Sequence, residues 1–333
     1  MSVTLDPDPL EVLPEAHREL LEHRCARLGS GLLTEQRPGP EGWAISDRSA
    51  AVEASLGRLF EHGRLGGTGY LSLLPVDHGT AFGAGNAFAA NPTHFDPEGI
   101  LELAVAGRCS GVVTTHGVLG SLARRYAHRL PLILKLNHHQ TLSRPPEARQ
   151  VLFARVRDAE RIGCVAVAAT VYFGGADTSR ELEEVSRLFS EAHRCGLATV
   201  LFCYLHSEAL RADGKNYALA SDLTGQANYE GATIEADLIK QKQPTLDGGF
   251  LALDLWGERR DLPDAATLEA LVGSHPIDRV RYQVIHGLAG RCGLINSGGP
   301  SGGNAMERAV RAAIINRRAG GIGLIAGRKV FQP

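Results

Sequence analysis

The sequence predicts a (β/α)8 barrel, an α/β TIM barrel, preceded by an N-terminal helical extension. Three observations favour this fold: eight short apolar runs follow residue 69, amphipathic segments separate them, and glycines cluster where the runs end. Near-continuous apolar strands that alternate with helices are typical of a parallel sheet covered by helices. A barrel domain of roughly 250 residues with an extension also fits the length of the chain.

Residues 1–65 are mainly polar and are interrupted by prolines, so we expect a helical extension packed on a barrel domain of residues 66–333. Helical spacing of apolar residues predicts helices over 145–162 and 178–195. The eight expected strands are Tyr70–Val76, Gly111–Thr115, Leu132–Leu136, Val165–Tyr172, Ala198–Leu205, Ala236–Lys240, Cys292–Asn296 and Gly321–Ala326.

Two segments depart from a regular barrel. The stretch 243–276 predicts a large loop with a short helix, Ala265–Val272, over the active-site end. The sequence stops at Pro333 just after the eighth strand, so we expect the eighth helix to be missing, with the extension or a neighbouring subunit in its place. The alternative fold is an open doubly wound sheet, but no Gly-x-Gly-x-x-Gly follows the first strand to indicate a dinucleotide site.

The composition argues against several classes of function. Basic and acidic residues number 35 and 37, with no basic stripe that would indicate nucleic acid as a partner. No apolar run approaches the roughly 18 residues of a membrane span, and no secretory signal is visible. The six cysteines are scattered without a C-x-x-C pair, which predicts reduced thiols in a cytoplasmic protein.

Lys240 is the strongest candidate for a catalytic residue, because it ends the sixth expected strand and active sites of such barrels lie at strand C-termini. Alternation puts Leu238, Lys240 and Lys242 on one face. If that face points inward, burial lowers the pKa of Lys240 and leaves free amine to attack a carbonyl. If it points outward, both lysines are simply solvated. Lys242 is the rival nucleophile, or a like charge that depresses the pKa of Lys240.

Two further side chains could move protons. Phe202 and Tyr204 share a face at the end of the fifth strand and offer an aromatic wall and a phenol. Asp77 follows the first strand and would place a carboxylate at the barrel mouth. The alternatives are a core tyrosine bonded to backbone and an ordinary turn aspartate.

Gly-rich turns follow the seventh and eighth strands, at 296–299 and 326–329. Loops at these positions of a barrel commonly form a phosphate site from backbone N–H groups. Arg328 adds a charge-assisted pair of donors. Together the two turns predict a site for a phosphorylated ligand.

Histidines near strand ends offer a metal-dependent alternative, as in class II aldolases and many hydrolases built on barrels. They are His78, His116, His138 and His139. No H-x-H or H-E-x-x-H motif occurs, and the adjacent His138 and His139 would diverge on a strand. We therefore expect no catalytic metal and no other cofactor.

The motifs taken together resemble one family, the archaeal-type class I fructose-bisphosphate aldolases in their bacterial branch. The similarity runs from about residue 15 to the end. It is carried by GYLSLLPVDHG (69–79), FAANP (88–92), RRYAHR (124–129), LKLNH (134–138), ASDLTGQAN (220–228), ADLIKQK (236–242), LINSGG (294–299) and GLIAGRK (323–329).

This resemblance implies reversible, metal-free cleavage of fructose 1,6-bisphosphate to dihydroxyacetone phosphate and glyceraldehyde 3-phosphate, a step of glycolysis and gluconeogenesis. It implies a cytoplasmic homo-oligomer, such as a decameric ring. It also implies roles for site residues: Lys240 as the Schiff-base lysine, Tyr204 as general acid/base, Asp77 as a proton-transfer carboxylate, Phe202 in place of the usual Trp, and substrate contacts from His78, Lys242, Ser297, Gly298, Gly299, Gly327 and Arg328.

One departure from the family pattern concerns the barrel mouth. The family commonly continues its first motif as D-[HQ]-G-x-E-H, whereas this chain has DHGTAF over 77–82, so Ala81 and Phe82 replace an acid and an imidazole. Two alternatives stay open. One is a related Schiff-base lyase or transferase, transaldolase-like or thiolase-like, that acts on another phosphorylated ketose. The other is a barrel that binds sugar phosphates with little catalysis.

Overall fold

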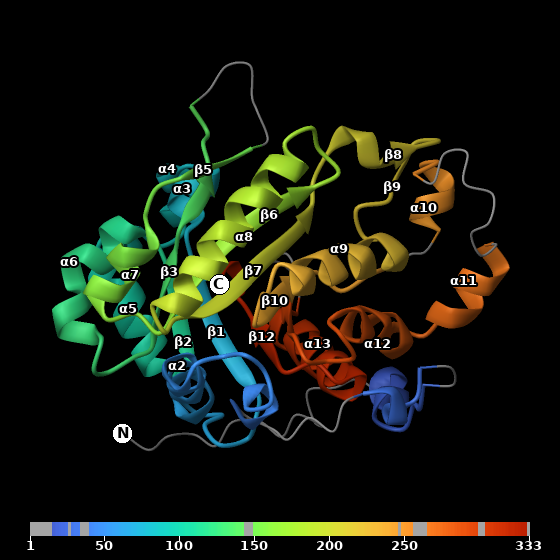
Figure 1. Ribbon diagram of the computed structural model, residues 1–333, viewed down its shortest axis with the longest axis horizontal. Helices are drawn as coiled ribbons and strands as arrows, with labels where there is room; N and C mark the ends of the chain where they lie inside the picture. The colour runs from blue at the N-terminus through green and yellow to red at the C-terminus, as the bar shows by residue number, and fades with distance from the viewer. Residues whose placement is uncertain are drawn as a thin grey trace.

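Eight parallel strands close into a barrel in the order β1-β12-β11-β10-β7-β6-β3-β2 (Figure 1). The computed structural model describes residues 15–25, 28–33, 40–142, 149–245, 248–255, 265–298 and 304–331. All eight predicted strands are present, with ends shifted by no more than two residues, and the closed barrel is confirmed. The strands are β1 Leu71–Val76, β2 Gly111–Thr114, β3 Leu132–Lys135, β6 Ala166–Phe173, β7 Ala198–Leu205, β10 Leu238–Gln241, β11 Gly293–Ser297 and β12 Gly323–Ile325.

Helices cover the outside of the barrel, and two small antiparallel sheets lie at its C-terminal end. The sheets pair β4 (Asn137–His139) with β5 (Gln150–Leu152), and β8 (Arg211–Ala212) with β9 (Lys215–Asn216). The helices that follow β1 are α3 His78–Phe82, α4 Ala84–Phe88, η4 Pro92–Phe95, α5 Pro97–Ala106, α6 His116–Tyr126, α7 Val156–Ile162, α8 Thr178–Arg194, η5 Glu208–Leu210, α9 Ser221–Thr233, α10 Gly249–Ala252, α11 Ala265–Val272, α12 Pro276–His286, α13 Ala305–Ala319 and α14 Arg328–Phe331.

The helix predicted over 178–195 is confirmed as α8, whose Val185 and Phe189 are fully buried. Of the helix predicted over 145–162, residues 145–148 lie outside the described residues. The prediction is wrong over Gln150–Leu152, which form the strand β5, and is confirmed over the shorter α7. Glu181 of α8 explains the difference: its carboxylate accepts a hydrogen bond from the backbone N of Gln150 at 2.7 Å, which holds that segment extended beside β4. Ala265–Val272 is helical, as predicted.

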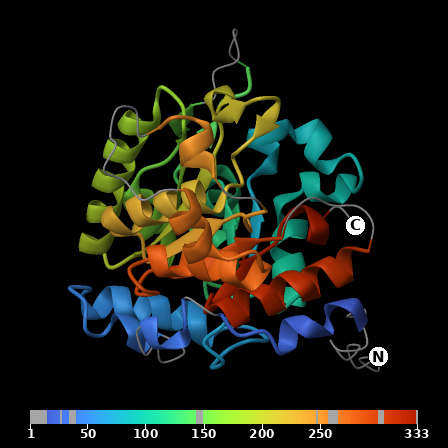
Figure 2. The ribbon, with the colours of Figure 1, turned by 90° about the vertical axis from the view of Figure 1, so that its right-hand side faces the viewer.

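The N-terminal extension lies beneath the barrel, at the N-terminal ends of the strands (Figure 2). It contains η1 Glu15–Leu21, η2 Ser30–Leu32, η3 Pro40–Trp43 and α2 Ala50–Glu61. The apolar face of α2 packs among inward-facing strand residues, with Leu56 and Phe60 in one cluster with Ile133 and Leu238. The extension therefore closes the bottom of the barrel, and the expectation that it covers the flank of the first and eighth strands is wrong. Its status as a separate domain stays a prediction.

The short helix α14 occupies the place expected for a missing eighth helix. Its Phe331 is buried in the same cluster as Leu74 and Val76 of β1, and its ring centroid lies 6.2 Å from that of Phe88. This aromatic side chain contributes to the apolar cover on the outside of β1. No helix among the described residues is long and apolar enough to cross a membrane.

A buried ionic network joins the extension to the barrel around Asp237, which is fully buried just before β10. Arg48 donates from Nε to its Oδ1 at 2.6 Å, and His193 Nε2 lies 3.1 Å from Oδ2. The backbone N of Thr199 donates to Oδ2 at 2.9 Å. Burial opposes ionisation of Asp237, but His193 and Arg48 outweigh it and lower its pKa.

We expect Arg48→Met to lower the free energy of unfolding by about 3 kcal/mol, because it leaves a buried carboxylate without its guanidinium partner. Urea denaturation followed by circular dichroism measures the change. Arg187→Met is the matched control, since Arg187 pairs with Glu183 on the exposed face of α8 and should matter by less than about 0.5 kcal/mol. Equal effects of the two substitutions would contradict the role of the network.

Candidate active site

The C-terminal ends of the strands surround two adjoining hollows. One, the β11–β12 hollow, has a volume of about 650 Å³ and is lined by residues that include Ser297, Gly298 and Gly327. The other, the β3–β7 hollow, has a volume of about 350 Å³ and is lined by residues that include Asp77 and Lys135. Both are lined by His78, Tyr204, Lys240, Lys242 and Arg328. These shared side chains make the two hollows one site.

The Lys240 side chain points into the barrel. This confirms the inward orientation considered in the sequence analysis, and the outward orientation, with Lys240 in solvent, is wrong. Leu238 belongs to the interior cluster and Ile239 to an outer one, as strand alternation requires. The Lys240 side chain is 7% exposed, and its Nζ lies 4.0 Å from the ring centroid of Phe202. Burial lowers the pKa of this amine to about 8, with Asp77 opposing and Arg328 adding to the shift.

Lys242 lies at the exposed rim of both hollows, with Nζ 5.6 Å from the ring of Tyr204. Its own pKa is lowered by partial burial and by the charge of Lys240. The hypothesis that Lys242 depresses the pKa of Lys240 is not supported, since burial is the main cause of that shift. Lys240 is therefore the amine best suited to attack a carbonyl.

Tyr204 follows Phe202 on β7, and both side chains face Lys240, whose Nζ lies 5.2 Å from the Tyr204 ring. Phe202 is almost fully buried beneath the amine. Burial raises the pKa of Tyr204, and the charge of Asp77 raises it further. The side chain is consequently a neutral phenol at physiological pH, and it lines both hollows rather than the core.

Asp77 faces the interior of the site and is no ordinary turn residue. It precedes α3, yet its side chain makes no capping hydrogen bond to that helix. Its Oδ2 lies 3.7 Å from His138 Nδ1 and 3.9 Å from Lys135 Nζ. Burial opposes ionisation, but contact with His138 and the charge of Lys135 outweigh it and hold the pKa of Asp77 well below its usual range.

Lys135 is a site residue that the sequence analysis missed. It is 1% exposed at the end of β3, donates to both oxygens of Asn137, and has a pKa lowered to about 8 by burial, with Asp77 opposing. The signal that could have found it is the one that identified Lys240: a lysine at the end of an otherwise apolar strand.

The predicted phosphate turns line the β11–β12 hollow through Ser297, Gly298, Gly327 and Arg328, while Gly299 lies outside the described residues. The backbone N of Gly298 donates to Ile325 O at 3.1 Å, so this N–H already has a protein partner. A Cβ at Gly327 would lie 2.6 Å from Pro75 O, so the approach of this turn to β1 requires glycine.

Positive charge dominates the β11–β12 hollow. Its cations are Lys240, Lys242, Arg308, Arg311 and Arg328, and none of its described lining residues is acidic. Phe82, which replaces the imidazole of the family pattern, is 58% exposed, and the Arg328 guanidinium carbon lies 5.7 Å from its ring centroid. The substitution thus places an aromatic face beside the cation of the predicted phosphate site.

The four histidines considered for a metal do not form one site. His116 lies on α6 beside Asp158, with Nε2 4.0 Å from the carboxylate, and it lines neither hollow. His78 lines both, and burial lowers its pKa to about 4. His138 and His139 both line the β3–β7 hollow, although adjacent side chains on a strand were expected to diverge.

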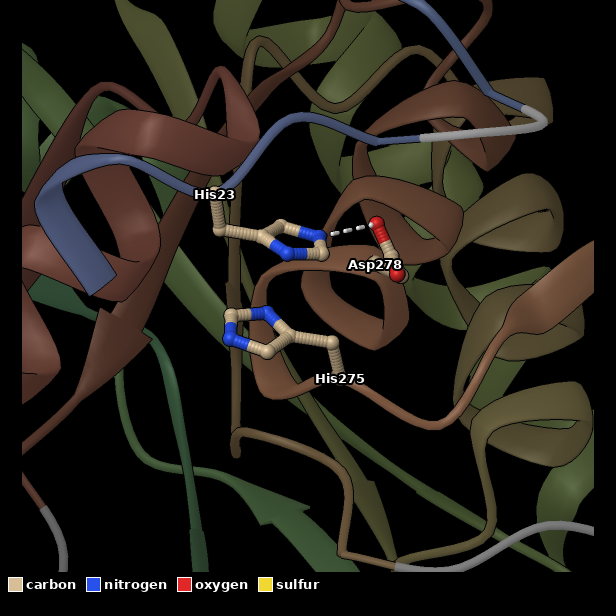
Figure 3. A group of neighbouring side chains, drawn as sticks. All are labelled: His23, His275 and Asp278. Atoms are coloured by element: carbon tan, nitrogen blue, oxygen red, sulfur yellow. Dashed lines mark hydrogen bonds and ion pairs between the residues drawn. The ribbon is translucent and has the colours of Figure 1, made fainter. Parts of the chain in front are cut away.

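Among the described residues, the one group with metal-ligand spacing is His23, His275 and Asp278, at the contact between the extension and α12 (Figure 3). The two imidazoles are stacked, with centroids 3.5 Å apart and planes at 13°. A metal ion binds in the plane of an imidazole, and two nearly parallel planes cannot share one. His275 Nδ1 also accepts from Ile277 N at 3.2 Å. This group therefore holds the extension to α12 through the 2.9 Å pair of His23 and Asp278.

The site unites a buried amine of lowered pKa, a neutral phenol, an ionised carboxylate and a cationic hollow. A deprotonated amine in such a setting can condense with a carbonyl to form an imine, and the phenol and carboxylate can transfer the accompanying protons. Imine formation with these proton transfers does not require side chains that bind a metal ion.

Comparisons with known proteins agree with this chemistry. The family model described as DeoC/LacD family aldolase matches residues 71–333. A protein of Chlamydia muridarum named "Probable fructose-bisphosphate aldolase class 1" is 47% identical over 330 residues, which cover 97% of this chain and 92% of that protein. A Thermoproteus tenax protein named "Fructose-bisphosphate aldolase class 1" is 28% identical over 237 residues, or 60% of this chain and 88% of that protein.

A solved structure shares the barrel. It is described as an archaeal fructose-1,6-bisphosphate aldolase with the catalytic Lys covalently bound to the carbinolamine intermediate of the substrate. It is 25% identical to this chain, covers 84% of it and 93% of its own length, and superposes with a TM-score of 0.64. The family match spans the whole barrel, including every described residue of the site, and the chain therefore belongs to the DeoC/LacD family of aldolases.

Proposed function

We propose that this protein is a class I fructose-bisphosphate aldolase, which cleaves fructose 1,6-bisphosphate reversibly into dihydroxyacetone phosphate and glyceraldehyde 3-phosphate. The observation that carries the proposal is the Lys240 amine, which is buried over Phe202, has a pKa lowered to about 8, and adjoins a hollow lined by cations. The relatives named for this activity, which span almost the whole chain at 47–48% identity, support the substrate.

The reaction follows from these groups. The neutral amine of Lys240 attacks the C2 carbonyl, and loss of water gives a protonated imine. The C4 hydroxyl gives up its proton, the C3–C4 bond breaks, and its electron pair moves into the imine to form an enamine. Protonation of the enamine at C3 and addition of water then release dihydroxyacetone phosphate and restore the amine.

Tyr204 and Asp77 divide the proton transfers. The raised pKa of Tyr204 keeps it a phenol, the form that protonates the C4 alkoxide during condensation, and the loss of the C4 hydroxyl proton during cleavage is the reverse of that transfer. Asp77 stays ionised beside Lys135 and accepts the proton that leaves the attacking amine. The cations of the β11–β12 hollow bind the C1 phosphate, with Arg328 as the bidentate donor.

The resemblance to the family also supports a homo-oligomeric assembly, such as a decameric ring. Size-exclusion chromatography with light scattering on the purified full chain measures its mass. We expect a mass several times that of one chain, and a monomer at micromolar concentration would contradict this part of the proposal.

We expect borohydride to trap dihydroxyacetone phosphate as a reduced adduct on Lys240, identified by peptide mass mapping. Lys240→Met should abolish the adduct and the cleavage activity, while Lys242→Met should retain an adduct on Lys240. An adduct on Lys242, or none in the unmodified protein, would refute the assignment. A panel of phosphorylated ketoses run in parallel separates the proposed substrate from a related one.

We expect Tyr204→Phe to slow cleavage of fructose 1,6-bisphosphate by roughly 10²–10⁴-fold, the usual loss when a general acid/base is removed. Imine formation should persist, because the hydroxyl is not needed for attack by Lys240. Stopped-flow kinetics and borohydride trapping measure the two steps separately. Unchanged turnover would reject the role of the phenol.

A further inference from the structure

We propose that Phe82 is a positioning residue for Arg328: the face of its ring holds the guanidinium at the active site and leaves the N–H donors free for the substrate phosphate. The inference rests on the proposed function, in which Arg328 binds the C1 phosphate, and it assigns the residue that orients this cation. Phe82 lies in the segment 77–82, where the chain departs from the family pattern. The role therefore belongs to this chain and is not carried over from the family.

The helix that carries Arg328 is held in place by aromatic contacts. α14 has four residues, Arg328–Phe331, and a helix this short is not stable by itself. Phe331 is buried against the outside of β1, and the His78 ring meets it edge to face at 4.9 Å. A Cβ at Gly327, just before α14, would lie 2.8 Å from His78 Cε1, so this imidazole also packs closely against the turn. These contacts fix the backbone of α14, but none of them involves the guanidinium of Arg328.

The guanidinium needs a contact of its own, because a free arginine side chain samples many rotamers. Arg328 is exposed, and among the residues that the structure describes no carboxylate pairs with it. Its carbon Cζ lies 5.7 Å from the ring centroid of Phe82, within the range of a cation–π interaction. Phe82 is therefore the side chain best placed to restrict Arg328 before a ligand binds.

An aromatic ring suits this task better than a carboxylate does. A carboxylate would occupy the N–H donors of the guanidinium and cancel its charge, whereas a ring contacts the face of the planar group. The donors lie in that plane and stay free for phosphate oxygens. The charge also stays effective at the site, since Arg328 lines both hollows with Lys240 and adds to the lowering of the pKa of that amine.

Phe82 is itself anchored by neighbouring rings. It ends α3, and its ring stacks on that of His78, the first residue of the same helix, with centroids 5.8 Å apart and planes at 27°. The His78 ring in turn contacts the buried Phe331, so three rings form a row from the outside of β1 to the barrel mouth. This row gives Phe82 a fixed position from which its ring can orient Arg328.

The test measures how tightly ligands with and without a phosphate bind before reduction on Lys240. The probes are dihydroxyacetone phosphate and dihydroxyacetone, each trapped with borohydride over a range of concentrations. In Phe82→Leu, which keeps an apolar side chain but removes the ring, we expect the half-saturating concentration of dihydroxyacetone phosphate to rise about threefold, the scale of an exposed cation–π contact. That of dihydroxyacetone should stay unchanged. Phe82→Tyr keeps the ring and should bind both ligands as the unmodified protein does.

A double-mutant cycle shows whether Phe82 acts through Arg328. In the Arg328→Met background, Phe82→Leu should cause no further loss, because the cation that the ring holds is gone. Phe95→Leu is the matched control: Phe95 is 56% exposed, close to the 58% of Phe82, and it lines neither hollow. This control should change the binding of neither ligand. In steady-state cleavage of fructose 1,6-bisphosphate, Phe82→Leu should raise KM with kcat unchanged, as for a contact made equally in the ground and transition states.

Three results would overturn the positioning role: equal weakening of both ligands in Phe82→Leu, no weakening of either, or a further loss in the Arg328→Met background. A Phe82→Tyr variant as weak as Phe82→Leu would also contradict it, because the ring is retained. If the unmodified protein forms the Lys240 adduct and any of these results is found, the role of Phe82 alone is wrong. If the unmodified protein forms no adduct and does not cleave fructose 1,6-bisphosphate, the proposed function is wrong and the inference with it.

Discussion

The burial of two lysine amines around one carboxylate is the constraint on which this structure depends. Lys135 and Lys240 are almost fully buried, and two ammonium ions in such a setting would carry a large desolvation cost. Asp77 offsets part of that cost through its charge, which raises the pKa of both amines against the effect of burial. The result is two amines that each lose a proton near pH 8, beside a carboxylate that stays ionised.

The lowered pKa values of the two amines depend on their burial, and the extension contributes to the apolar interior below them. The helix α2 fills the bottom of the barrel with apolar side chains, and the cluster that contains Leu56 and Phe60 continues upward to Phe202, directly beneath Lys240. The buried network of Arg48 and Asp237 links the segment before α2 to the base of β10, the strand that carries Lys240. A segment remote from the chemistry thus packs into the same apolar cluster as the side chain beneath the reactive amine.

The two ends of the barrel mouth carry different kinds of side chain. Arginines surround the β11–β12 hollow, while imidazoles and aromatic rings dominate the far end of the β3–β7 hollow. Phe82 belongs to this mouth, with its ring beside Arg328 and 5.8 Å from His78. The change from the family pattern at Ala81 and Phe82 therefore alters the wall of the site, whereas Lys240, Tyr204 and Asp77 converge on one space.

The sequence by itself determined the eight strands and placed Lys240, Tyr204 and Asp77 at strand C-termini, because these follow from local patterns and from the common C-terminal edge of parallel strands. The tertiary structure decided that these side chains point inward and line one space. Only the tertiary structure decided the partners of those residues. Lys135 of β3 meets Asp77, which follows β1, over the intervening strand β2. Glu181 holds β5 extended where local spacing indicated a helix, and the extension packs under the barrel rather than on its flank. These outcomes depend on contacts between segments far apart in the chain, which no local pattern encodes.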